Sequence, residues 1–125
     1  MIKFLTNINI DGILEAIEKS FSIKHLTKPN KRLVYGVAEG PEHSVFVRGT
    51  SNGVIHFPEE WKWLINVDTI TVQLTAIGKS QLLWVDAICD DRIVVKSRAK
   101  NIEFFYFVQA ERKDIPKLET EKDDV

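Results

Sequence analysis

Short segments of alternating apolar and polar residues, separated by turn residues, are the feature that most limits how this chain can fold. In the clearest segment, 68–76, the even positions from 70 onward are apolar and the odd positions are threonine or glutamine. Turn pairs such as Pro29-Asn30, Asn52-Gly53 and Gly78-Lys79 recur along the chain, at spacings of roughly ten residues. This pattern predicts an all-β, mainly antiparallel fold, either a β-sandwich or a barrel-like module.

The same pattern predicts the positions of the individual strands and of one helix. We expect strands at 20–25, 33–38, 45–47, 53–57, 68–76, 81–87, 92–97 and 102–110. One short helix is expected at 58–65, because proline suits the first helical position and the two glutamates that follow suit its positive end. Asn52-Gly53 predicts a tight hairpin between two of the strands.

The two ends of the chain differ from this central module. Ile8 and Ile10 alternate as in a short strand, and Asp11-Gly12 predicts a turn. Residues 11–19 fit a helix and a strand equally well, so the N-terminal segment is expected to be extended or helical. The sequence therefore divides into an N-terminal fibre-like or oligomerisation segment (1–19), a β-sandwich module (20–112) and a polar tail (113–125).

Composition excludes several classes of protein. The 125 residues carry 17 basic and 18 acidic side chains, a net charge of −1. A binder of nucleic acid needs a basic surface, so no nucleic-acid partner is expected. No apolar run approaches the length of a membrane span. The single cysteine excludes an internal disulfide and a cysteine-based zinc cluster.

A cluster of charges surrounds the turn at Gly40-Pro41. Glu39, Glu42 and Arg48 lie close together in sequence there, with His43 between them. The cluster offers ligands for a metal, but nothing in its spacing is diagnostic. We interpret it as a structural turn or corner joining two strands and held by Arg48, and we predict no metal and no cofactor.

Catalytic signatures are not recognisable elsewhere. Ser44 follows His43 directly, and neighbours on a strand point to opposite faces, so the two do not form a nucleophile–base pair. The chain has no glycine-rich phosphate loop. The sequence is therefore interpreted as a protein that is not an enzyme.

Aromatic and aliphatic residues indicate surfaces for partners. The strand at 102–110 carries Phe105 and Phe107 on the face opposite Phe104 and Tyr106. Both faces need cover, which indicates either a central strand under the helix expected at 58–65 or a subunit interface, and we favour the interface. The interface residues predicted are Ile8, Ile10, Ile13, Ile17, Phe105 and Phe107. Trp61 and Trp63 are candidate contacts for a partner or a glycan, although Trp61 also fits a plug at one end of the core.

Five pieces of the chain together resemble a module found in virion structural and tail-fibre proteins of tailed bacteriophages. They are 19–25 (KSFSIKH), 33–49 (LVYGVAEGPEHSVFVRG), 54–61 (VIHFPEEW), 68–78 (DTITVQLTAIG) and 105–114 (FYFVQAERKD). The segment 7–12 (NINIDG) is similar to the repeats of a fibre shaft.

The resemblance implies a β-rich module near the C-terminal end of a fibre, usually a homotrimer, that serves assembly or adsorption. The expected location is the virion, after synthesis in the host cytoplasm. The expected partners are the chain itself, other phage tail proteins and a host surface glycan. One alternative is a fibre-folding chaperone or a cap that sets trimer register. A less favoured alternative is a glycan hydrolase that uses Glu39 and Glu42 as its carboxylate pair.

Overall fold

The computed structural model describes residues 1–124, and almost all of its regular structure is β-strand. The strands are β1 (Ser20–Lys24), β2 (Arg32–Gly36), β3 (Ser44–Ser51), β4 (Val54–His56), β5 (Thr71–Ala76), β6 (Leu83–Ile88), β7 (Arg92–Ser97) and β8 (Phe104–Glu111). Two short helical turns, α1 (Trp61–Leu64) and η1 (Val67–Thr69), lie between β4 and β5. The predicted all-β antiparallel fold is confirmed.

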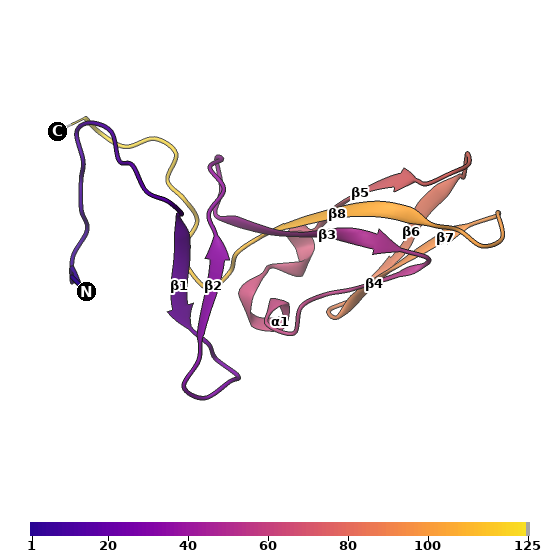
Figure 1. The fold of residues 1–125 in the computed structure, drawn as a ribbon, viewed down its shortest axis with the longest axis horizontal. Coiled ribbons are helices and arrows are strands. Elements are labelled where there is room, and N and C mark those ends of the chain that lie inside the picture. Colours follow the sequence, from indigo (N-terminus) through magenta and orange to yellow (C-terminus); the bar gives the residue numbers. More distant parts are fainter. Residues whose placement is uncertain (125) are drawn as a thin grey trace.

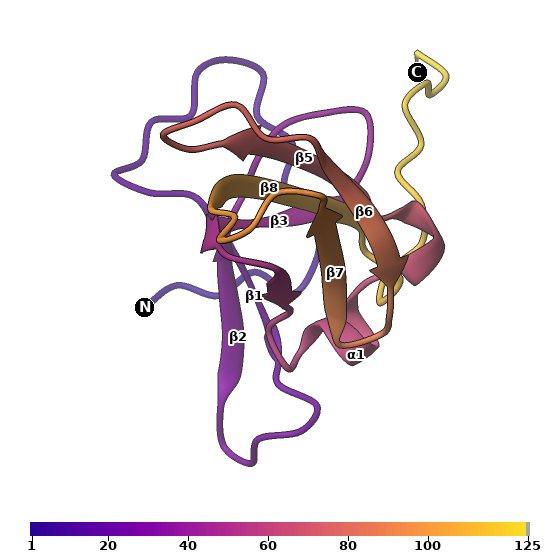
Figure 2. The same cartoon turned by 90° about the vertical axis from the view of Figure 1, so that its right-hand side faces the viewer.

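Two three-stranded antiparallel sheets form a sandwich. One sheet has the order β3-β8-β5 and the other β4-β7-β6. Figure 2 shows them as two layers, with α1 below and the β1–β2 hairpin to one side. The strands therefore form separate sheets, which decides for the sandwich and against the barrel-like alternative.

The core lies between the two layers, because alternate residues of each strand point inward. Phe104, Val108 and Ala110 enter it from β8, whereas Ile93 and Val95 enter it from β7, and all five are buried. Burying one such side chain contributes roughly 1.5–3 kcal/mol to folding. The outer face of β5 is the predicted threonine and glutamine face, exposed at Thr71, Gln73 and Thr75.

The β1–β2 hairpin is a third, two-stranded sheet that stands beside the sandwich (Figure 1). Its strands pair Phe21 with Tyr35 and Ile23 with Leu33. These four side chains face the sandwich, where Leu33 is buried and the others pack against the same core. The hairpin is thus an extension of the module that shares its hydrophobic core.

Two predicted turns connect different sheets rather than neighbouring strands. The residues between β2 and β3 contain Gly40-Pro41, yet β2 pairs with β1 and β3 pairs with β8. Similarly, Asn52-Gly53 leads from β3 into β4 of the opposite sheet. The predicted hairpin at Asn52-Gly53 is wrong, and the interpretation of Gly40-Pro41 as a corner is confirmed.

The helix and the termini also differ in part from the sequence prediction. The expected helix at 58–65 is shortened to α1, because a tight turn with a Trp61 N–H to Pro58 carbonyl bond precedes it. The expected strand at 68–76 begins at Thr71, since the Asn66 side chain caps η1. Residues 1–19 contain no strand or helix, so neither the helix nor the strand expected for 11–19 forms, and the strand expected around Ile8 and Ile10 is absent.

Candidate self-association surface

The outer face of the β3-β8-β5 sheet carries three aromatic side chains, which we call the aromatic face: the exposed Phe46 and Phe105 and the partly buried Phe107. Phe46 is 45% exposed and Phe105 is 55% exposed. They face outward because each sits between inward-pointing neighbours on its strand. Apolar rings at such exposure mark a contact surface more often than a solvated one.

The rings of the aromatic face are ordered by cross-strand packing. Phe46 and Phe107 stack with centroids 5.1 Å apart and an interplanar angle of 16°. Polar neighbours surround them: Arg48 lies opposite Phe107 on one side, and Gln73 lies opposite it on the other. An apolar centre with a polar border is the usual arrangement of a protein interface.

A groove borders the aromatic face at the start of β3. It is lined by 35–38 and 44–46 and has a volume of about 350 Å³. Val37 is half exposed along it, and the buried Val45 lies at its base. β3 pairs with β8 alone, so within the described residues its other edge has no strand partner. An apolar groove beside an open strand edge is suited to receive an extended segment.

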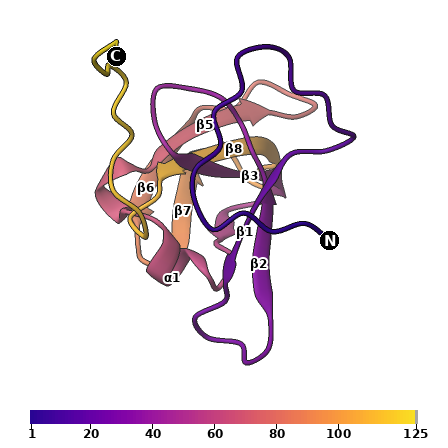
Figure 3. The ribbon, with the colours of Figure 1, turned by 90° about the vertical axis from the view of Figure 1, so that its left-hand side faces the viewer.

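Residues 1–19 form the largest unpacked apolar region. Figures 1 and 3 show this segment as a loop without a strand arrow, at the end of the molecule that also holds the C-terminal tail. Its exposed large apolar residues are Met1, Ile2, Phe4, Leu5, Ile8, Ile10, Ile13, Leu14 and Ile17. The four isoleucines predicted for an interface are 53–107% exposed. Nothing within the described monomer covers them, and their role in an interface stays a prediction.

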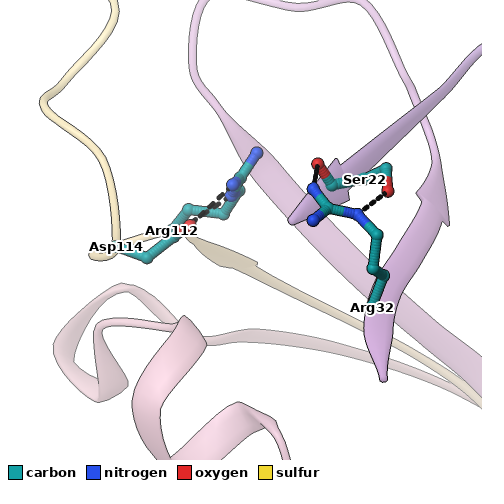
Figure 4. Close-up of polar contacts among 4 residues, drawn as sticks. All are labelled: Ser22, Arg32, Arg112 and Asp114. Atoms are coloured by element: carbon teal, nitrogen blue, oxygen red, sulfur yellow. Dashed lines mark hydrogen bonds and ion pairs between the residues drawn. The ribbon is translucent and has the colours of Figure 1, made fainter. Parts of the chain in front are cut away.

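Arg112, which the sequence analysis did not single out, joins the hairpin to the sandwich. Its guanidinium lies 4.1 Å from the ring centre of Phe21 and pairs with Asp114 at 2.6 Å (Figure 4). The backbone N–H of Arg112 donates to the carbonyl of His43. In the sequence, this junction is visible only as Arg-Lys-Asp after a long strand, which looks the same as the start of an ordinary polar tail. Asp114, two residues beyond the predicted boundary at 112, thus contacts the module through this ion pair.

A second polar contact fixes the hairpin from its other strand. The Tyr35 hydroxyl donates to Glu60 Oε1 at 2.7 Å. Burial raises the pKa of Tyr35 above its ordinary value, and the hydrogen bond to Glu60 raises the pKa further. Within the hairpin itself, Arg32 donates to the hydroxyl and the carbonyl of Ser22 (Figure 4). The walls of the groove at Tyr35 and Gly36 are therefore held in place.

The charged turn is not held as predicted. Glu39 pairs with Lys19 at 3.6 Å, with 87% of the Glu39 side chain exposed. Arg48 points to the aromatic face and forms no ion pair among the described residues. The prediction that Arg48 pairs with Glu39 and Glu42 is wrong. Arg48 lies in the middle of β3, on the outer face of the β3-β8-β5 sheet, and not at the turn that holds the two glutamates. Neither Glu39 nor Glu42 lines the two grooves beside this corner.

Trp61 and Trp63, the two tryptophans predicted as partner or glycan contacts, occupy different environments. Trp61 is 0% exposed and packs against Phe57, with ring centres 5.2 Å apart. It is a core residue, so its assignment as a glycan contact is wrong and the plug interpretation is confirmed. Trp63 is partly exposed and meets His25 edge to face at 5.6 Å. His25 is buried, and its Nδ1 accepts from the backbone of Thr27 and Lys28, which closes the β1–β2 loop.

Among the described residues we find neither a metal-binding cluster nor a membrane-spanning helix. Within residues 1–124, His, Cys, Asp and Glu do not gather in groups of three that would hold a metal. The helices of this part of the chain are too short to cross a membrane. Comparisons with protein-family models, curated proteins and solved structures find no match. The surface is thus interpreted from its geometry.

Proposed function

We propose that this chain is a non-catalytic assembly module that forms a homo-oligomer. The observation that carries the proposal is the exposure of the large apolar residues of 1–19, such as Ile13 at 86% and Ile17 at 107%. Monomeric proteins rarely leave this many large apolar side chains exposed to water. Burial against a second copy removes this surface from solvent, and each aliphatic side chain then contributes roughly 1.5–3 kcal/mol.

The aromatic face supports the same proposal. Phe46 and Phe107 are already stacked in the monomer, so little side-chain freedom is lost when a partner covers them. Aromatic residues at the centre of an interface commonly carry a large share of its binding free energy. Phe105 extends the surface along β8, beside Thr75 of β5.

The resemblance to tailed-phage modules supplies a setting for this assembly. In that setting the chain is a component of a tail fibre or fibre tip in the virion, forms a trimer, and contacts other tail proteins or a host surface glycan. This part of the proposal rests on the sequence resemblance alone, whereas self-association rests on the exposed surfaces.

Sedimentation velocity of the full chain over a concentration range tests self-association. We expect the weight-average mass to rise above 14.4 kDa at micromolar concentration, because the apolar residues of 1–19 in one copy are buried against another copy. A mass that stays at the monomer value up to about 100 μM corresponds to association weaker than about 5.5 kcal/mol and would contradict the proposal.

A further inference from the structure

We propose that residues 3–10 of one copy add as a strand to the free edge of β3 in a second copy. This inference rests on the proposed self-association and names the two surfaces that meet. The segment has the alternation of a strand but no strand partner in the monomer. β3 has the complementary property, an unpaired edge in the described chain.

The side chains of the segment divide as such a strand requires. Within 3–10, Phe4, Thr6, Ile8 and Ile10 lie on one face, and Lys3, Leu5, Asn7 and Asn9 lie on the other. A strand placed beside β3 has one face toward the groove and the other toward the outer surface of the sheet. The mainly apolar face fits the groove at 35–38, and the more polar face continues the outer surface.

Charge agrees with this orientation. Arg48 lies on the outer face of β3 and has no ion-pair partner among the described residues. The more polar face of the segment carries Lys3 at its start, and Asp11 follows directly after its end on the same face. Opposite charges on neighbouring strands favour pairing and like charges disfavour it, so the register that brings Asp11 rather than Lys3 beside Arg48 is favoured.

β3 is also the most suitable of the sandwich edges. It is eight residues long, like the segment 3–10, and its register with β8 runs unbroken from Ser44 to Ser51. β6 has a bulge between Val85 and Ala87, and bulges hinder pairing at an edge. β4 spans three residues, and β5 lies next to β6 in the opposite layer. The longest regular edge therefore adjoins the apolar groove.

The experiment separates strand addition from simple apolar burial. Successive backbone N–H groups of a strand point to opposite sides, so Thr6→Pro and Asn9→Pro in the full chain together cover both orientations. The matched controls are Thr6→Ser and Asn9→Ser. Association is measured by sedimentation, and hydrogen exchange is followed at those β3 amides that do not bond to β8.

Strand addition predicts that at least one proline variant weakens association more than tenfold and leaves the β3 edge amides in fast exchange. The serine variants should retain the association and the slow exchange of the wild type. If Ile8→Asp with Ile10→Asp dissociates the oligomer but neither proline variant does, strand addition is overturned while self-association stands. Slow exchange of the β3 edge in a monomer would also overturn it, since the segment would then dock within its own chain.

Discussion

The phenolic oxygen of Tyr35 lies 2.7 Å from Oε1 of Glu60, and this hydrogen bond joins the β1–β2 hairpin to the residue that precedes α1. It is part of the wall that keeps the groove beside β3 in shape. Replacing Tyr35 by Phe removes the hydrogen bond but keeps the ring stacked on Phe21. We expect Tyr35→Phe to lower the free energy of unfolding by about 1–2 kcal/mol, measured by urea titration.

Alkaline pH provides an internal check on this contact. The pKa of Tyr35 is raised, first by burial and then by the bond to Glu60, so the folded state holds the proton more tightly than the unfolded chain. The resulting stabilisation is complete below the ordinary tyrosine pKa of about 10 and is lost as pH rises above it. Between about pH 9 and pH 11, the wild type should lose more stability than Tyr35→Phe. Equal losses of stability in the two proteins would contradict a raised pKa for Tyr35 in the folded state.

Local patterns predicted most strands but not their partners. Alternation tells which face of a strand is buried, and turn residues tell where it ends, so β1, β5 and β8 were located within a few residues. Which strands pair depends on contacts far apart in sequence, such as Val45 with Ala110. The alternation of apolar and polar residues along a strand is the same whichever strand it pairs with. For that reason Asn52-Gly53 was assigned to a hairpin although it connects two layers.

The candidate surface was predicted in part for the same reason. Alternation predicts that Phe105 and Phe107 share one face of their strand, but with aromatic residues on both faces it does not tell which face is the outer one. Phe46 was missed, since Val45, Phe46 and Val47 form an unbroken apolar run with no visible alternation. The ion pair expected for Arg48 does not form, because Glu39 pairs with Lys19 instead and Arg48 lies on the outer face of β3.

Close packing at Gly49 predicts a destabilising substitution. A Cβ at this position would lie 2.9 Å from the hydroxyl of Tyr106 and 3.1 Å from its ring. Tyr106 packs against the core, so its ring has little freedom to move. We expect Gly49→Ala to lower stability by about 1–3 kcal/mol in urea unfolding.

Gly36→Ala is the matched control for this substitution. Gly36 also lies in a strand, but a Cβ there meets no atom within 4 Å. Its effect should be within about 0.5 kcal/mol of zero. Similar losses in both variants would show that strand glycines, and not the contact with Tyr106, account for the effect.

The ion pair between Arg112 and Asp114 predicts a larger effect than other ion pairs of the chain. Only 8% of the Arg112 side chain and 14% of the Asp114 side chain are exposed. Asp114→Asn leaves the guanidinium near Phe21 without its counter-charge, so we expect a loss of about 2 kcal/mol in chemical denaturation. Lys117→Ala is the control, because Lys117 is 84% exposed in its pair with Glu111 and should cost less than about 0.5 kcal/mol. Equal costs would refute the role of Arg112 as a junction.

The aromatic face predicts a change in association without a change in fold. Phe105 is more than half exposed, so Phe105→Ser should alter the free energy of unfolding of the monomer by less than about 1 kcal/mol. It should weaken association at least several-fold if the ring lies in the interface. Thr75→Ser, at the position paired with Phe105, should leave association unchanged. The measurement is sedimentation at matched concentrations.

Sedimentation equilibrium of the wild type beside Ile8→Asp/Ile10→Asp tests the central claim most directly. Asn7→Asp/Asn9→Asp adds the same two charges on the other face of the segment and serves as the control. The account predicts an oligomer for the wild type and the control. It predicts a monomer that still unfolds cooperatively in urea for the isoleucine variant, because these side chains are exposed in the monomer. An identical mass for all three proteins would contradict self-association through the N-terminal segment.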